Sequence, residues 1–286
     1  MMKTAVIVCS NAALDYIDHN YDIPIFRSVI IFNENEKYDD YTEIKADDFY
    51  KRLDIDKSSF PHTAFVSVGQ MEKTFDELKS KGYERAFVIV ISKELSSLGN
   101  TVELIAKDYE GLDIKVYNSQ TIAYPEAKMA LLASKMFNEG KDLNEVIAEL
   151  DYIKNNNHLF FAVETLEYLI KNGRLSKFAG AAANMLSIKP LLHLNKDGKV
   201  ETLEKIRTSK KARSRMVELF LDDITGKDVE AFIINTNASE EVLNELKNKV
   251  LENRPDLGNL KVYPLTPVVG AHAGPKTVCL GYIVNR

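Results

Sequence analysis

Apolar residues in the first half of the chain alternate between short continuous runs and spaced patterns. Four runs, at residues 4–10, 28–32, 86–92 and 113–119, are apolar and rich in β-branched residues, which predicts four strands. Strands that are apolar on both faces are typical of a parallel sheet covered by helices on both sides. We therefore expect these strands in one parallel sheet.

Helical patterns separate these runs. In residues 67–82, Met71, Phe75 and Leu78 are spaced by four and three, which predicts an amphipathic helix closed by a glycine. Residues 97–111 and 125–140 repeat this design, and each also ends in glycine. Strand–helix–strand order predicts a doubly wound α/β domain, which we place at residues 1–157.

The pattern changes after residue 157. Asp197 and Gly198 supply the turn of a predicted hairpin, which among strand–helix units indicates a mixed sheet. We therefore expect a second α/β domain at residues 158–286. Its predicted elements are a strand at 158–164, a short helix at 165–173 capped by Thr165, the hairpin at 189–206, helices at 209–224 and 239–252, and a strand at 229–237.

Composition excludes several classes of protein. The chain has 286 residues, of which 45% are hydrophobic and 28% charged, the balance of an ordinary globular protein. Its net charge of -5 provides no basic field for nucleic acid. Cys9 and Cys279 each lie inside an apolar run, which favours buried thiols in a reducing compartment. No run is long enough to cross a bilayer, so we expect a cytoplasmic protein without a transmembrane segment.

Neutral polar residues follow the predicted strands of the first domain. In an open parallel sheet, ligands bind beyond the carboxyl ends of the strands. Ser96 and Ser97 also lie where a helix begins, so hydroxyls and backbone N–H groups there are suited to a small anionic group. The alternative, that these residues only cap helices, stays open. The residues are Ser10, Asn11, Ser92, Ser96, Ser97, Asn100, Thr101, Ser119, Gln120 and Thr121.

The usual catalytic and cofactor motifs do not occur in the sequence. Two lone cysteines and five dispersed histidines form no zinc-binding pattern, so we expect no metal. The chain contains no phosphate-binding loop, no dinucleotide-binding glycine motif and no nucleophile elbow. We therefore expect no cofactor and no self-contained kinase, dehydrogenase or esterase.

Four stretches contain short motifs that lie in order along the chain. Residues 166–212 contain a Gly-Arg-Leu-Ser run, an Asn-Met-Leu-x-Ile-Lys run, the hairpin and a Lys-Ile-Arg with trailing lysines. The other three stretches are PHTAF, ISKELSS and HAGPK. Together they resemble the motifs of the DegV family of bacterial fatty-acid-binding proteins, in which the last three read Pro-x-Thr-Ser, Ser-x-x-Leu-Ser-Gly and His-x-Gly-Pro-Gly. The sequence departs from the family pattern at Cys9-Ser10-Asn11, at Ala64 and at Lys276.

The resemblance implies a two-domain protein that binds one long-chain fatty acid between its domains and is not itself an enzyme. The head group would lie on the side of the first domain and the acyl tail in the second. Thr63 and Ser96 are then carboxylate ligands, with His272 and Arg174 near the head group, and Ser97 belongs to the same polar edge. The family also implies an ATP-binding fatty-acid kinase as partner, for which this chain would be the substrate-presenting subunit. In the family, the arginine that matches Arg207 belongs to the docking surface.

Two local patterns agree with the resemblance. Ala182, Met185, Leu186 and Ile188 lie in a segment of small and apolar residues that suits the lining of an acyl tunnel, although close helix packing is the alternative. Lys205 and Lys210 flank Arg207 in a basic span of an acidic protein, for which a solvated face is the ordinary explanation.

Two enzyme hypotheses stay open beside the carrier. One is a hydrolase with Ser96 as nucleophile and His272 as base, although no orienting acid follows a recognisable motif. The other is an enzyme subunit that resembles dihydroxyacetone kinases and attaches its substrate covalently through histidine. His272 itself stands among alanines and glycines, and we expect it either to be satisfied by a backbone carbonyl or to meet a polar group of the ligand.

Overall fold

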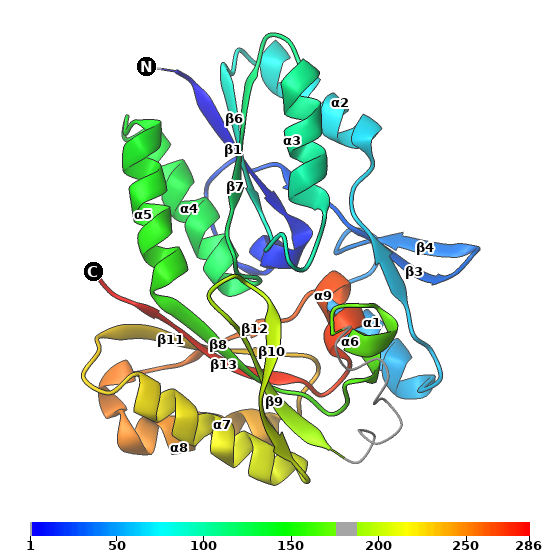
Figure 1. Ribbon diagram of the computed structural model, residues 1–286, viewed down its shortest axis with the longest axis vertical. Coiled ribbons are helices and arrows are strands. Elements are labelled where there is room, and N and C mark those ends of the chain that lie inside the picture. Colours follow the sequence, from blue (N-terminus) through cyan, green and yellow to red (C-terminus); the bar gives the residue numbers. More distant parts are fainter. Residues whose placement is uncertain (1, 176–187) are drawn as a thin grey trace. The chain divides into compact units, whose positions relative to one another are not determined.

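The computed structural model describes residues 2–175 and 188–286 (Figure 1). The chain divides into two compact units, each built from several stretches of sequence. The predicted domain boundary at residue 157 stays a prediction. Each of the two compact units includes residues from both sides of that position. Unit 1 comprises Met1–Val29, Thr63–Asn155 and Lys196–Lys199, and unit 2 comprises Ile30–His62, Asn156–Asn195 and Val200–Arg286.

Unit 1 contains a four-stranded parallel sheet in the order β2-β1-β6-β7. Ala5 pairs with Ala86, and Ala86 pairs with Ile114, so the central strands run in register. The predicted parallel sheet is confirmed, with three of the four expected strands in it. The strands are β1 (Thr4–Cys9), β2 (Ile25–Phe26), β6 (Arg85–Val90) and β7 (Asp113–Asn118).

The placement of the fourth predicted strand in this sheet was wrong. Residues 28–32 contribute instead to β3 (Val29–Asn33), in a three-stranded sheet with β4 (Glu36–Asp39) and β5 (His62–Ala64). Ile30 is fully buried while its neighbours in β3 are only partly buried, so the apolar run serves a strand that is covered mainly on one side. The two-residue strand β2 takes its place and is too short to leave a pattern in the sequence.

Helices cover both faces of the unit 1 sheet (Figure 1). Ile7 and Val88 pack on one face in a core with Phe75 of α2. On the other face the rings of Phe87 and Phe137 lie 5.6 Å apart. The doubly wound architecture is therefore confirmed. The helices are α2 (Val68–Ser80), α3 (Leu98–Asp108), α4 (Tyr124–Asn138) and α5 (Leu143–Asn155).

Unit 2 contains a six-stranded sheet in the order β10-β9-β8-β13-β11-β12. Only the pair β11–β12 is parallel and the other four pairs are antiparallel, so the predicted mixed sheet is confirmed. The strands are β8 (Asn157–Ala162), β9 (Lys189–Leu194), β10 (Val200–Ile206), β11 (Val229–Asn235), β12 (Lys261–Pro264) and β13 (Val278–Val284).

A hydrophobic core joins this sheet to its two long helices. Phe220 and Met216 of α7 are fully buried against Phe160 and Leu280 of the sheet. The described part of the chain includes no helix with the length and apolar composition that a membrane span requires. Cys9 and Cys279 are buried free thiols, as predicted. The helices of unit 2 are α1 (Ala46–Ile55), α6 (Glu167–Lys171), α7 (Ser209–Asp223), α8 (Glu240–Asn253) and α9 (Pro267–Ala273).

Candidate functional site

Hydrogen bonds tie together the polar ends of the unit 1 strands. Ser92 N donates to Thr121 O at 3.2 Å, and Lys93 N donates to Asn118 Oδ1 at 3.2 Å. The Ser119 hydroxyl donates to Thr121 O, also at 3.2 Å. Much of the predicted polar edge is thus used to join the loops after β6 and β7.

Ser96 and Ser97 precede α3, as the sequence predicted. The half-buried Ser96 accepts a hydrogen bond from Leu98 N at 3.2 Å, and therefore caps the first turn through its oxygen. Its O–H group remains a donor, because a hydroxyl can accept and donate at once. Ser97 is exposed and makes no side-chain cap bond. Thr63, which lies in β5, is half-buried and belongs to the same unit.

The sequence did not reveal an acid at this edge, but the structure contains one. Glu126 of α4 is fully buried, and its Oε2 accepts a hydrogen bond from Asn11 Nδ2 at 2.8 Å. Its Oε1 has no hydrogen-bond partner among residues 2–175 and 188–286. Burial raises the pKa of Glu126 well above its usual value, which favours a neutral carboxyl group. The helical pattern of residues 125–140 placed Glu126 on a helix but not on its buried face.

The predicted hairpin turn contacts the same edge. Gly198 has φ +78°, and a Cβ atom there would lie 2.3 Å from Ser92 Oγ and 2.7 Å from Gln120 O. Only glycine fits this combination of conformation and close approach. Lys199 Nζ lies 3.3 Å from Glu94 Oε2. The turn therefore packs against the loops that follow β6 and β7.

In unit 2 the structure brings His272 and Arg174 together with two residues that the sequence did not single out, His62 and Asn172. We call these four residues the His272 cluster. Burial, together with smaller contributions from the neighbouring Arg174 and His62, lowers the pKa of His272 to about 3. Burial also lowers the pKa of Arg174. His272 is therefore a neutral imidazole at pH 7.

Asn172, which is 8% exposed, connects the members of this cluster. Its Nδ2 donates to Ala271 O at 2.9 Å and to Pro61 O at 3.3 Å. Its Oδ1 lies 2.8 Å from His62 Nδ1. Arg174 Nη1 donates to the carbonyl oxygen of Asn172 at 2.6 Å. One buried amide thus joins the residue before Thr63, the end of α6 and the helix of His272.

Packing fixes the short helix α9. Tyr50 of α1 is buried, and its hydroxyl donates to Leu265 O at 2.7 Å. A Cβ atom on Gly270 would lie 2.1 Å from that hydroxyl, so the glycine allows close contact between α1 and α9. The alanines beside His272 and the glycine on its N-terminal side are therefore part of a packed helix. After it, Lys276 has φ +59°, at the position where the family motif has glycine.

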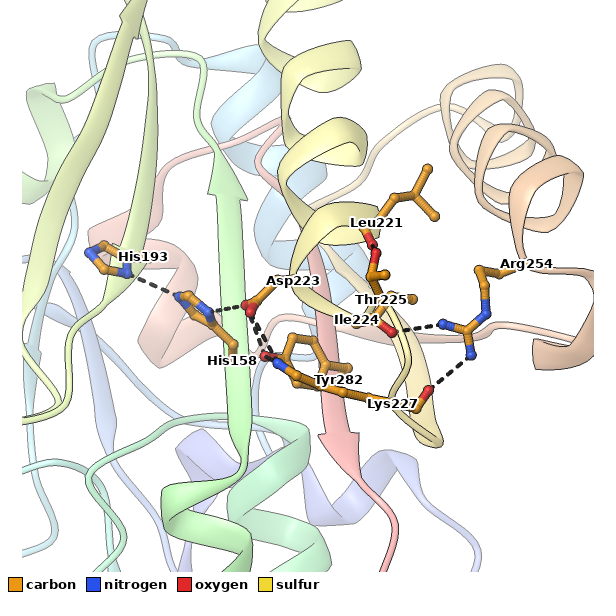
Figure 2. A network of polar contacts seen from close by, with 9 residues as sticks. All are labelled: His158, His193, Leu221, Asp223, Ile224, Thr225, Lys227, Arg254 and Tyr282. Carbon is orange, nitrogen blue, oxygen red and sulfur yellow. Dashed lines mark hydrogen bonds and ion pairs between the residues drawn. The ribbon is translucent and has the colours of Figure 1, made fainter.

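A second group of ionisable residues lies elsewhere in unit 2 (Figure 2). His158 Nδ1 and the Tyr282 hydroxyl each lie 2.8 Å from Asp223 Oδ2, and Lys227 Nζ lies 3.1 Å from Asp223 Oδ1. His158 Nε2 is 3.0 Å from His193 Nδ1. We call these five residues the Asp223 cluster. Although desolvation opposes it, hydrogen bonding by His158, Tyr282 and Lys227 holds the pKa of Asp223 below its usual value.

The other predicted residues are only partly described. Ala182, Met185 and Leu186 lie outside the described residues, and Ile188 is half-buried just before β9. Lys205, Arg207 and Lys210 are exposed on β10, after it and on α7. Among residues 2–175 and 188–286, no three His, Cys, Asp or Glu side chains are grouped so that they could hold a metal ion.

The family prediction is decided by comparison of the whole chain. The sequence profile of the DegV family, described as an uncharacterised protein family, matches residues 3–285. This chain belongs to the DegV family. A DegV domain-containing protein of Clostridium acetobutylicum is 31% identical, with 98% of each chain covered.

Solved DegV structures share the fold of this protein. A fatty-acid-binding DegV family protein of Streptococcus agalactiae superposes with a TM-score of 0.89 at 24% identity, with 100% of both chains covered. The fatty-acid kinase B3 protein of Streptococcus pneumoniae, solved with linoleic acid, has a TM-score of 0.79 at 19% identity and covers 99% of this chain and 100% of its own. These proteins are described as binding proteins or as the B3 protein of a kinase, in line with the predicted class.

Proposed function

We propose that this protein binds a long-chain fatty acid and presents it to an ATP-dependent fatty-acid kinase, which forms the acyl phosphate. The observation that carries the proposal is the family membership of the whole chain, together with DegV relatives of the same fold that are described as fatty-acid-binding. The chain keeps Thr63, Ser96, Arg174 and His272 at the matching positions of the family motifs.

The head group is received in this proposal by neutral donors. The hydroxyls of Thr63 and Ser96 donate to the carboxylate, Ser97 lies beside them, and His272 and Arg174 complete the polar surroundings. His272 is neutral because burial lowers its pKa to about 3, so it contributes a hydrogen bond rather than a full charge. A carboxylate held mainly by hydroxyls keeps an oxygen available to attack the γ-phosphate of ATP.

The acyl tail supplies most of the affinity. A palmitate tail has about 14 methylenes, and at about 0.8 kcal/mol each their burial contributes on the order of 11 kcal/mol before entropy losses. Ala182, Met185, Leu186 and Ile188 are the proposed lining of the tail site. The head group then needs only to avoid being left without hydrogen-bond partners.

The exposed basic residues are the proposed contact with the kinase. Arg207 and Lys210 carry positive charge at the surface, and Lys205 lies beside them on β10. A cluster of this sign, in a chain with a net charge of -5, suits an acidic surface on the partner.

Native mass spectrometry tests the proposal directly. We expect the purified protein to carry a C14–C18 acid that organic extraction removes and palmitate restores. Thr63→Val and Ser96→Ala should each weaken palmitate binding by roughly tenfold, because each removes one hydrogen bond to a charged group. Thr74→Val, which changes another half-buried threonine of unit 1, is the matched control and should bind normally.

Two outcomes would contradict the carrier. A protein that neither copurifies with an acid nor takes up palmitate after extraction does not have the proposed function. A mass adduct that survives denaturation would instead support an enzyme that attaches its substrate covalently.

A further inference from the structure

We propose that His62 is a further residue of the fatty-acid head-group site, and that Asn172 is the positioning residue that fixes the His62 proton on Nδ1 and leaves Nε2 for the ligand. The inference rests on the proposed function and adds to it two residues that no family motif contributed. His62 occupies the variable position of the Pro-x-Thr segment, directly before Thr63.

The first step is the orientation of the Asn172 amide. An amide has one end that donates and one that accepts, and its orientation follows from its partners. Pro61 O and Ala271 O are carbonyl oxygens, which only accept, and both face the same atom of Asn172, at 3.3 Å and 2.9 Å. That atom is therefore the NH2 nitrogen. The amide oxygen consequently faces His62.

The second step is the tautomer of His62. The Asn172 oxygen cannot donate, so the contact of 2.8 Å requires a hydrogen on His62 Nδ1. In the neutral ring Nε2 then carries the lone pair. Because Asn172 is 8% exposed and holds two backbone carbonyls at the same time, it cannot turn to serve the other tautomer without leaving those carbonyls unpaired.

The third step places this imidazole beside the predicted head-group residues. The amide that orients His62 also binds the carbonyl of Ala271, the residue before His272. The ionisable groups around His62 are Arg174 and His272. Arg174 donates to the backbone carbonyl of Asn172, and the pKa of His272 is lowered in part by His62. Of the two histidines, His62 is exposed and His272 is half-buried.

These steps give His62 a chemical role. A lone pair on Nε2 and a carboxylate oxygen repel each other unless a proton lies between them. When the acid arrives protonated, its O–H bond breaks as the Nε2–H bond forms, and an imidazolium remains beside the carboxylate. The Nδ1–H···Oδ1 bond to Asn172 holds both the neutral and the charged ring in the same orientation.

Nuclear magnetic resonance of the imidazole nitrogens reads the tautomer. In the ligand-free protein at pH 8, we expect His62 to carry its proton on Nδ1, whereas free histidine prefers Nε2–H. Asn172→Leu removes the acceptor and should release His62 to the Nε2–H form. A wild-type His62 that is already in the Nε2–H form would overturn the positioning role of Asn172, whether or not the variant folds.

The affinities for two ligands with the same tail test the role of His62 in binding. Palmitate and methyl palmitate share one tail, but only palmitate can share a proton with Nε2. His62→Ala should lower the affinity ratio of palmitate to methyl palmitate roughly tenfold, the effect of one charge-assisted hydrogen bond. His19→Ala, at a half-buried histidine of unit 1, is the matched control and should leave the ratio unchanged.

A double variant separates positioning from packing. If Asn172 acts through His62, His62→Ala/Asn172→Leu should lower the ratio no more than His62→Ala alone. A full additional loss in the double variant, or an unchanged ratio in His62→Ala, would overturn the inference while the wild type still binds palmitate. Failure of the extracted wild type to bind palmitate would overturn the proposed function instead.

Discussion

Unit 2 contains two groups of histidines that differ in what surrounds them. In the Asp223 cluster each histidine has an acid within reach, since His158 Nδ1 lies 2.8 Å from Asp223 Oδ2 and His193 Nε2 lies 4.0 Å from Glu201 Oε2. In the His272 cluster the neighbours that act on His272 are the basic residues Arg174 and His62, both of which lower its pKa. Asn172 adds only an uncharged amide.

Under the proposed function, the Asp223 cluster is structural and the His272 cluster lies at the ligand. The carboxylates of Asp223 and Glu201 already supply negative charge to these histidines, and the hydrogen bonds of Asp223 link α7 to the sheet (Figure 2). Basic groups that lie beside one another disfavour each other's protonation until an anion joins them. The head group of a fatty acid is such an anion, and three variants break or sharpen the comparison.

The largest expected effect is the loss of stability in acid that His272 causes. The pKa of His272 is about 3 in the folded protein and about 6.5 in an unfolded chain, so the unfolded state binds the proton first and stability falls as pH drops from about 6.5 toward 3. At pH 4.5 this amounts to about 2 kcal/mol after partial exposure is allowed for. His272→Gln should remove this part of the loss between pH 7 and 4.5, as measured by urea unfolding. An equal loss in wild type and variant would show that His272 is not the depressed group.

A smaller effect is expected at Asp223. Asp223→Asn removes the charge that faces Lys227 and His158, and we expect a loss of about 1.5 kcal/mol in the free energy of unfolding at pH 7, since the site is partly exposed. The pKa of Asp223 is lowered, so its contribution is present at neutral pH and is lost as pH falls through that pKa. Palmitate affinity should not change. Weaker palmitate binding in this variant would break the comparison, because the Asp223 cluster would then serve the ligand too.

The smallest effect concerns the loop after α9. Lys276 has φ +59°, a left-handed conformation that is unfavourable for any residue with a Cβ atom. Lys276→Gly should stabilise the protein by about 0.8 kcal/mol, measured as a shift of the urea midpoint. Lys196→Gly, at the hairpin turn, is a control without a positive φ and should give no gain. A loss of stability in Lys276→Gly would mean that the lysine side chain contributes more than its backbone conformation costs.

The sequence predicted the architecture because both sheets leave strong periodic signals. Continuous apolar runs identified β1, β6 and β7, and the Asp197-Gly198 turn identified the hairpin that makes the second sheet mixed. The prediction that residues 28–32 belong to the parallel sheet was wrong because a five-residue apolar segment also suits a strand that is buried on one side only.

Of the candidate site, only the residues that belong to family motifs could be predicted from the sequence. Thr63, Ser96, Arg174 and His272 followed from the family resemblance, and the structure groups the last two. His62 and Asn172 left no signal, because a single amide that bonds to residues 110 and 99 positions away is a property of the folded chain. Glu126 was hidden for the same reason, since its burial depends on the face that α4 turns to the sheet.

The interleaving of the two units has a practical consequence for anyone who tries to separate them. The chain passes from one unit to the other five times, at residues 29, 62, 155, 195 and 199. A single proteolytic cut at any one of these points does not separate the units, because at least one of the two fragments still contains residues of both. Neither unit can be expressed as one continuous gene segment, so dissection of this protein calls for point substitutions rather than truncation.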